Sequence, residues 1–205
     1  MIWKKHWNRK YLIDKLKLLW WQRQNPDAPW LTADGIAFLD NWLKKSDVGV
    51  EFGSGRSTMW FAARIAQLTS IEHDPGWHAI VKEKINQLNN VEYLHVSLDN
   101  KTNGEPDYPA VLERFADNSL DFVLVDGRYR VECAEVALRK IKPGGLLILD
   151  NSDLYFYHPT STPSPLRKLS DMEPAWQVFQ ASVHSWRRYH TSNGVFDTSF
   201  FFKQQ

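Results

Sequence analysis

The sequence predicts an α/β fold in which helices cover both faces of a mostly parallel sheet. Between residues 48 and 150, short apolar segments alternate with segments of helical periodicity, which is typical of parallel strands joined by right-handed helical crossovers. The chain has 205 residues, of which 43% are hydrophobic and 24% are charged, as expected for one globular core. The formal net charge is +1, so the composition does not indicate a nucleic-acid partner.

Other features of the composition bear on the compartment. Cys133 is the single cysteine, so no disulfide can form within the chain, which is typical of a reducing compartment. No segment approaches the roughly 18–20 apolar residues of a membrane span. The basic start is not followed by the apolar stretch of a secretory signal. We therefore expect a cytoplasmic protein, and contact with a membrane surface stays open.

Residues 1–30 are expected to form a basic, Trp-rich helical extension. Basic residues outnumber acidic ones there, and aromatic and leucine side chains recur at helical spacing over Trp7–Trp21. Pro26 and Pro29 end this helix. Three roles stay open for it: packing on the domain, a homodimer contact, or contact with an anionic membrane surface.

Residues 31–205 are expected to form the main domain. Strands are predicted at Val48–Phe52, Leu68–Glu72, Val91–Val96, Leu120–Asp126 and Leu146–Asp150. Helices are predicted at Thr32–Lys45, Ser57–Gln67, Trp77–Leu88, Tyr108–Ala116 and Val131–Lys140. Residues 151–175, rich in Ser, Thr and Pro, are expected to be a lid or substrate loop. The Asn193-Gly194 turn predicts an antiparallel hairpin of Arg187–Thr191 and Thr198–Lys203.

Acidic residues lie at or near the ends of four of the predicted strands. These residues are Glu51, Glu72, Asp126 and Asp150. The carboxyl ends of parallel strands meet at one edge of the sheet, where ligands of α/β proteins bind. The pattern therefore predicts a site for a hydroxylated or cationic ligand.

A glycine loop follows the first predicted strand and opens the next helix. Gly53 and Gly55 allow a tight turn, but no Gly-Lys-Ser/Thr of a P-loop follows. Glu72 follows Gly53 at about the 20-residue distance between a glycine loop and a ribose-binding acid. The Glu51 carboxylate would repel a pyrophosphate and attract an ammonium or sulfonium group. S-adenosylmethionine therefore fits this loop better than NAD.

Four segments resemble those of class I S-adenosylmethionine-dependent methyltransferases: VGVEFGSGRST, SIEHDPGWHAI, LDFVLVDGRYR and IKPGGLLILDN. The resemblance covers about Leu31 to Lys203 and implies a Rossmann-like, doubly wound, seven-stranded sheet whose last strand is antiparallel. It also implies the cofactor-binding residues. Glu51, Gly53, Ser54 and Gly55 would line the methionine end, Glu72 would bind the ribose, and Ser97 or Leu98 would lie near the adenine, with Ser57 and Asp126 as further cofactor-binding residues.

The chain also resembles the metal-dependent catechol and caffeoyl-coenzyme A O-methyltransferases. Asp126, Asp150 and Asn151 match the positions that bind a divalent ion in those enzymes. The resemblance implies a Mg²⁺ or Ca²⁺ ion that would hold the acceptor hydroxyl and lower its pKa. Those enzymes have a lysine where this chain has Tyr129, and the positively charged candidates nearby are Arg128 and Arg130. In a metal-free alternative, Asp126 would orient the substrate and Asn151 would be a hydrogen-bonding partner.

The expected function is methyl transfer from S-adenosylmethionine to an oxygen of a small molecule. A sugar, a phenol and a lipid-linked glycan are the expected acceptors. Asp126, Asp150 and His158 are the candidate catalytic residues, and a surface histidine without a role is the alternative for His158. Two other functions stay open. One is a non-catalytic module that acts through the N-terminal helix, and the less favoured one is an NAD-dependent oxidoreductase.

Overall fold

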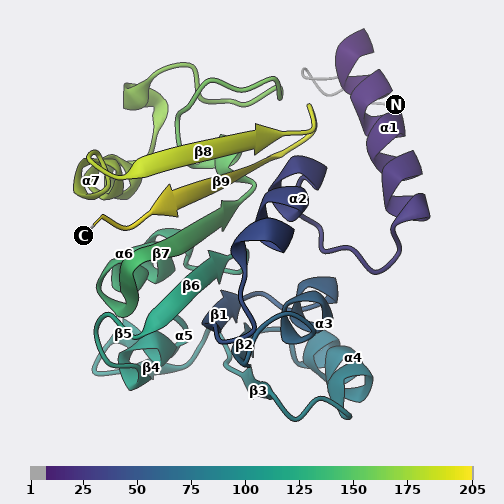
Figure 1. Cartoon of the computed structure of the whole chain (residues 1–205). Helices are drawn as coiled ribbons and strands as arrows, with labels where there is room; N and C mark the ends of the chain where they lie inside the picture. Colours follow the sequence, from purple (N-terminus) through teal and green to yellow (C-terminus); the bar gives the residue numbers. More distant parts are fainter. Residues whose placement is uncertain (1–7, 205) are drawn as a thin grey trace.

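The computed structural model describes residues 8–204 and contains one seven-stranded sheet (Figure 1). In spatial order its strands are β3 (Val91–His95), β2 (Gln67–Glu72), β1 (Val48–Phe52), β6 (Leu120–Val125), β7 (Ile141–Asp150), β9 (Asp197–Phe202) and β8 (Arg187–Ser192). β9 is antiparallel to both of its neighbours, and the first five strands in this order are parallel to one another. The predicted seven-stranded fold is therefore confirmed, including its antiparallel last strand.

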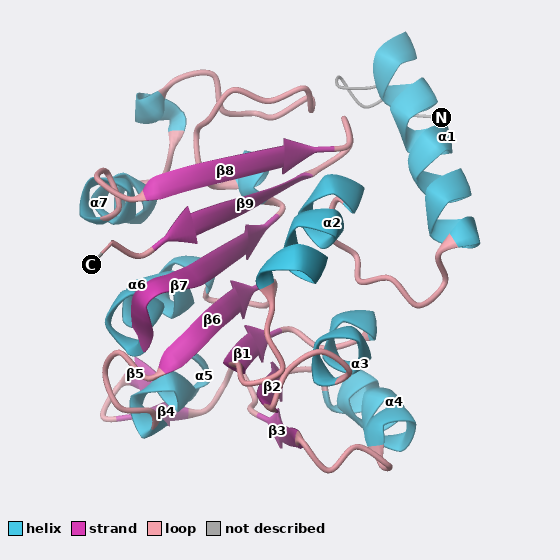
Figure 2. Cartoon of the chain, viewed as in Figure 1, coloured by secondary structure: helices cyan, strands magenta, loops and turns pink. Residues whose placement is uncertain are grey.

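Helices pack against both faces of this sheet (Figure 2). The main helices are α1 (Arg9–Gln24), α2 (Ala33–Trp42), α3 (Arg56–Ala62), α4 (Pro75–Ile85), α5 (Asp107–Ala110), α6 (Arg130–Lys140) and α7 (Pro174–Ser182). Side chains of α5, α6 and α7 belong to one core cluster, and side chains of α2 and α3 belong to a second. A small separate hairpin joins β4 (Lys101–Thr102) to β5 (Glu105–Pro106).

The apolar side chains of β7 pack in both core clusters. Leu147 and Leu149 pack in the cluster under α6, whereas Leu146 and Ile148 pack in the cluster under α2. Successive side chains of a strand point to opposite faces of the sheet. A strand covered on both faces therefore reads as a continuous apolar segment rather than an alternating one.

Three helical expectations differ from the structure. The helix expected over Ser57–Gln67 ends at Ala62, and Gln67 begins β2. The helix expected over Tyr108–Ala116 is the short α5 followed by a 3-10 turn, Val111–Arg114. α7 was not predicted, because Pro174 lies in the proline-rich stretch 151–175, which was expected to be irregular. Its signals are present, since proline is favoured in the first helical turn and Trp176 and Phe179 are buried at helical spacing.

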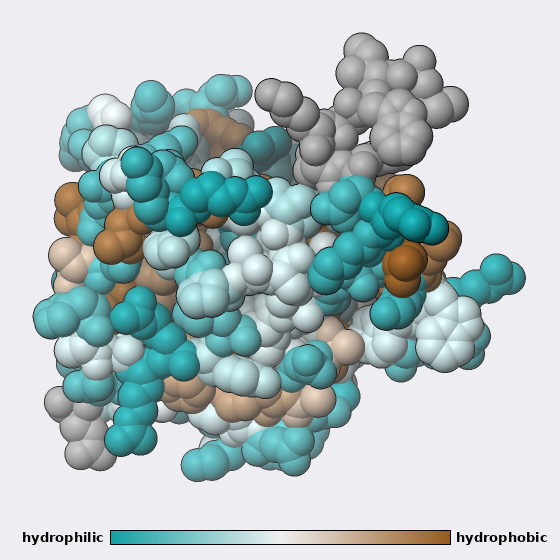
Figure 3. Space-filling model, turned by 90° about the horizontal axis from the view of Figure 1, so that it is seen from above, coloured by the Kyte–Doolittle hydropathy of each residue, from teal (hydrophilic) through white to brown (hydrophobic). Residues whose placement is uncertain are grey.

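α1 lies at the edge of the domain (Figures 1 and 3). Its buried and exposed side chains show that it packs on the domain with one face only. Leu18 is buried, and Trp21 packs against the core cluster under α2. The helix was expected to begin at Trp7, which lies outside the described residues. Within residues 8–204, no helix has the length and apolar character needed to cross a membrane.

Candidate active site

A cavity of about 640 Å³ opens at the carboxyl edge of the parallel strands. Residues that follow β1, β2 and β6 line it, together with Trp30 and Leu31 between α1 and α2 and Tyr155 after β7. Its volume is in the range of about 300–1,000 Å³ that is usual for cofactor and small-molecule sites. The predicted edge of the sheet therefore carries a pocket large enough for a nucleoside cofactor.

The expected cofactor residues divide into two groups in the structure. Those that line the cavity are Gly53, Ser54, Gly55, Ser57, Glu72 and Asp126. Glu51, Ser97 and Leu98 are not among the residues that line it. The glycine loop and the end of β2 thus meet at the cavity as the sequence predicts. The side chains of Glu51, Ser97 and Leu98 are not placed for direct contact with a ligand in this cavity.

The turns that follow β1 and β6 approach each other closely at the floor of the cavity. Gly53 has φ +88°, and a Cβ there would lie 3.1 Å from the backbone carbonyl of Asp126. A Cβ on Gly127 would lie 2.1 Å from the buried Tyr108 hydroxyl. Glycine is required at both positions by this close approach.

Glu72 holds the glycine loop against the end of β2. Its Oε2 accepts hydrogen bonds from the Ser54 amide (3.2 Å) and hydroxyl (2.9 Å), and its Oε1 accepts from the amides of His73 (2.8 Å) and Asp74 (2.9 Å). The Ser54 hydroxyl is also 2.7 Å from the Tyr93 hydroxyl, so it can turn away from Glu72. One acceptor position of the carboxylate then becomes available to a ligand hydroxyl.

Glu51 supports the loop from below and does not face the cavity. Its side chain is fully buried, and its Oε1 accepts hydrogen bonds from the hydroxyls of Thr58 and Ser70, the latter at 2.7 Å. The Thr58 hydroxyl in turn accepts from the Gly55 amide (3.0 Å). The expected contact of Glu51 with the methionine end is therefore replaced by an indirect role: it fixes the conformation of Gly55 through Thr58.

The ionisation of Glu51 is costly in the folded protein. Desolvation raises the pKa of its carboxyl to about 7, although the hydroxyls of Thr58, Ser70 and Ser57 oppose the shift. Its Oε2 is buried and makes no hydrogen bond with any residue of the described part of the chain. Burial of a carboxylate that lacks a positive partner explains this direction.

We expect the free energy of unfolding to depend on the Glu51 charge. Below pH 4.5 the carboxyl is protonated in both states and contributes nothing, whereas between pH 4.5 and 7 only the unfolded state loses the proton, so stability falls as pH rises. The full loss corresponds to about 3 kcal/mol above pH 7. Urea unfolding of Glu51→Gln should show a smaller decrease between pH 5 and 8, since the raised pKa values of Asp126 and Asp150 remain. Glu92→Gln, half-buried on β3, should keep the full decrease. An unchanged pH profile in Glu51→Gln would contradict the assignment.

Arg130, at the start of α6, is the centre of the polar network between β6 and β7. Its guanidinium donates to the carbonyl of Gly127 (3.0 Å), to the carbonyl and Oδ1 of Asp126 (3.0 and 2.9 Å), to Oδ1 of Asn151 (3.3 Å) and to the carbonyl of Asp150. The side chain is 12% exposed and lines the cavity. Arg130 therefore ties the ends of the two strands together at the site.

These contacts do not fit the expected metal ligands. Asp126 and Asn151 both direct an oxygen at Arg130, and Asp150 offers its carbonyl rather than its carboxylate. The Asp150 carboxylate is buried beside β9, where it accepts from the Thr198 hydroxyl (2.8 Å). Within residues 8–204, no group of three His, Cys, Asp or Glu side chains is placed to hold a metal ion. The guanidinium takes the place that the resemblance gives to a divalent cation.

Burial also affects the two aspartates of this network. Desolvation raises the pKa of Asp126, and the adjacent Arg130 charge opposes that shift. Desolvation and the neighbouring Asp126 charge raise the pKa of Asp150 well above its ordinary value. Asp150 does not line the cavity, so a direct catalytic role for its carboxyl does not fit the structure.

His158 is not placed to act as a base in the cavity. Its Nε2 is 2.9 Å from Asp197 Oδ2, and its Nδ1 is 2.9 Å from the Phe156 carbonyl. The ring stacks on His190 with a centroid separation of 4.2 Å, and the residue is buried. Both ring nitrogens have partners inside the fold, so the structure indicates that His158 anchors the segment after β7.

Residues that the sequence did not single out also reach the cavity. Trp77, on the first turn of α4, donates its indole N–H to the Ser54 carbonyl (2.9 Å) and lies over Gly55. Asp74 caps α4 by accepting from the Trp77 amide (2.7 Å). The Asp74 cap predicts where α4 begins, and therefore that Trp77 lies in its first turn. It does not predict that the indole of Trp77 packs over the glycine loop.

Comparisons with known proteins agree with this geometry. A model of a methyltransferase domain matches residues 50–152. No curated protein matches the sequence. Similar solved structures include a methyltransferase-like protein from Silicibacter pomeroyi (21% identity, 87% of this chain and 89% of that chain, TM-score 0.57). They also include an O-methyltransferase from Bacillus cereus in complex with S-adenosylhomocysteine (15% identity, 97% and 92%, TM-score 0.59). At these identities the structural likeness concerns the fold.

Proposed function

The chain belongs to the methyltransferase-domain family whose model matches residues 50–152, and on this premise we propose that it transfers the methyl group of S-adenosylmethionine to a hydroxyl group of a small molecule. Its sheet has the class I topology, with β9 antiparallel between β7 and β8. A sugar, a phenol or a lipid-linked glycan is the acceptor class that we propose.

The observation that carries this proposal is the pairing of the glycine loop with Glu72 at the cavity. The carboxylate of Glu72 is fixed by backbone amides on both sides and faces a pocket of about 640 Å³. Once the Ser54 hydroxyl turns to Tyr93, a carboxylate held in this way has one acceptor position for a hydroxyl of a ribose.

The cofactor, when bound, supplies an electrophilic methyl group, and the protein has to position the acceptor for in-line attack. Asp126 is the side chain best placed for that task, because it lines the cavity and is 34% exposed. Its Oδ1 is held by Arg130, so Oδ2 is left to accept the proton of an acceptor hydroxyl. We propose that Asp126 orients the acceptor and accepts its proton.

We also propose that this step uses no divalent cation at Asp126 and Asn151. Arg130 already donates to both side chains, and its fixed positive charge can stabilise an acceptor oxygen as it loses its proton. Methyl transfer should therefore be insensitive to EDTA.

A calorimetric titration of the whole chain tests the proposed function. We expect S-adenosylmethionine and S-adenosylhomocysteine to bind and NAD not to bind. Mass spectrometry of incubations with a panel of sugars, phenols and lipid-linked glycans should then show a product heavier by one methylene group. Binding of NAD alone would contradict the proposal, and binding of none of these ligands would favour a non-catalytic module.

A further inference from the structure

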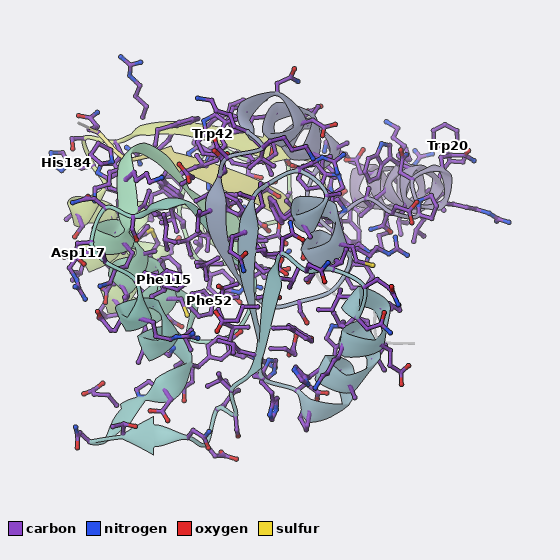
Figure 4. The ribbon with its side chains drawn as sticks, turned by 60° about the horizontal axis from the view of Figure 1, so that its bottom comes forward. Trp20, Trp42, Phe52, Phe115, Asp117 and His184 are labelled. Carbon is purple, nitrogen blue, oxygen red and sulfur yellow. The ribbon has the colours of Figure 1, made fainter. Side chains whose placement is uncertain are left out.

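α1 carries apolar side chains on the face opposite to the one that packs on the domain. Leu12, Ile13, Leu16, Leu19 and Trp20 are exposed, with Leu16 at 67% and Trp20 at 66%. At about 100° per residue, these five positions fall within an arc of about 120° on one side of the helix. Figure 4 shows Trp20 pointing away from the domain. We call these five residues the apolar stripe of α1.

The opposite face fixes α1 to the domain, so the exposure of the apolar stripe is built into the fold. Leu18 is buried there and Trp21 is half-buried. Lys10 donates to the Ser161 carbonyl (3.2 Å), and Asp14 lies against the β8–β9 turn at Gly194. The stripe is therefore not the face by which the helix joins the core.

The charges around the apolar stripe have one sign. α1 contains five basic residues and one acidic residue: Arg9, Lys10, Lys15, Lys17, Arg23 and Asp14. Asp14 is on the domain face and pairs with Lys10 (2.7 Å) and, at 3.8 Å, with Lys17. Lys15 and Lys17 flank the stripe, and Arg9 and Arg23 lie at its two ends. The whole chain has a net charge of only +1, so positive charge is concentrated on this helix.

We propose that α1 binds an anionic lipid surface, with the apolar stripe in the headgroup region and the flanking basic side chains on the phosphates. A helix with apolar residues, a tryptophan and flanking lysines has the chemistry of an interfacial segment. A second copy of the chain fits less well, because a symmetric contact through the stripe brings two sets of basic residues together. The inference does not depend on the proposed methyl transfer.

The position of α1 places such a surface near the cavity. The short connection from α1 to α2 contains Trp30 and Leu31, which line the cavity, and Trp30 is 58% exposed. Residues 25–32 connect α1 to α2, so only this short segment separates the apolar stripe from the cavity-lining Trp30 and Leu31 (Figure 1). A lipid-bound acceptor could reach the cavity without leaving the membrane surface.

Co-sedimentation of the full chain with lipid vesicles tests this proposal. We expect binding to phosphatidylcholine vesicles that contain about 30% phosphatidylglycerol, and little binding to pure phosphatidylcholine. Raising NaCl to about 0.5 M should reduce the bound fraction at least fivefold, because salt screens the basic side chains. Failure to bind anionic vesicles, or equal binding to both kinds, would overturn the proposal.

Matched variants locate the contact. Leu16→Glu should reduce binding to the anionic vesicles at least tenfold, because it places a charge inside the apolar stripe. Val178→Glu is the control, since Val178 is also an exposed apolar residue (61%) but lies on α7. Circular dichroism should show both variants folded. Equal loss in the two variants, or a dimer in light scattering that Leu16→Glu converts to a monomer, would contradict the lipid contact.

Discussion

An Arg130→Ala variant is expected to bind a divalent cation at least tenfold more tightly than the wild-type protein does. Five oxygens converge on the guanidinium, two from side chains and three from backbone carbonyls. These are the oxygen types that hard cations prefer. In the wild-type protein the fixed charge of Arg130 occupies their centre and repels a metal ion. Removal of the guanidinium leaves the oxygens and an uncompensated Asp126 carboxylate.

Calorimetry with Mn²⁺ and Mg²⁺ measures the increase in cation affinity of Arg130→Ala over the wild-type protein. Thermal unfolding gives a readout that does not need activity, because an ion that binds only the folded state raises its melting temperature. Mn²⁺ should therefore stabilise Arg130→Ala and leave the wild-type protein unchanged. The double variant Arg130→Ala/Asp126→Asn should not show this increase in cation affinity, because one of the two side-chain oxygens then lacks its charge.

Arg139→Ala is the matched control for this experiment. Arg139 also lies on α6 and pairs with the carboxylates of Glu113 and Asp117, but at the surface. Its removal leaves Lys140 beside both carboxylates, so no cation site should appear. Two results would contradict the conclusion that Arg130 occupies the position of the cation. One is Mn²⁺ binding through Asp126 in the wild-type protein, and the other is a folded Arg130→Ala variant with no increase in cation affinity.

Arg130 shows which part of the site the sequence could not predict. The sequence places Asp126, Asp150 and Asn151 at neighbouring strand ends, and the structure confirms that placement. Three of the five acceptors of Arg130 are backbone carbonyls, which carry no sequence signal. Whether a cation or a guanidinium fills the space between them depends on the direction of the Arg130 side chain at the start of α6.

Glu51 and His158 were misplaced for different physical reasons. Side chains alternate along a strand, so in β1 the neighbours of Glu51, Val50 and Phe52, face one core cluster, while Glu51 faces Thr58 of α3. That alternation predicts that Glu51 points away from the cluster of Val50 and Phe52, whereas its position near the end of a strand predicts a place in the site. His158 lies in a proline-rich segment whose burial depends on long-range contacts with Asp197 and His190.

The cofactor loop was more predictable because its determinants are local. Glycines are required where the turns after β1 and β6 meet, and the acid that ends β2 follows at the spacing of a ribose-binding site. The strand–helix alternation, with its apolar runs, fixes which strand ends share an edge of the sheet. The structure adds that Glu72 holds the loop itself, which makes this residue the strongest test of the cofactor site.

Glu72→Ala is expected to weaken S-adenosylmethionine binding roughly 10- to 150-fold. Hydrogen bonds to a charged group contribute about 1.5–3 kcal/mol, which corresponds to this range. The variant also leaves the amides of Ser54, His73 and Asp74 without their acceptor. Part of the loss should therefore come from a less ordered glycine loop, and urea unfolding of the free protein measures that part.

A cofactor analogue separates the ribose contact from the support of the loop. The 2′-deoxy form of S-adenosylhomocysteine lacks one of the two ribose hydroxyls, so it should lose less affinity than S-adenosylhomocysteine when Glu72 is replaced by glutamine. Glu92→Gln, on the neighbouring strand β3 and away from the cavity, should bind both ligands as the wild-type protein does. Equal losses for the two ligands in Glu72→Gln would show that Glu72 acts on the loop alone. Unchanged affinity in Glu72→Ala would remove the cofactor from this edge of the sheet, because no other carboxylate that lines the cavity is held by the amides of the glycine loop.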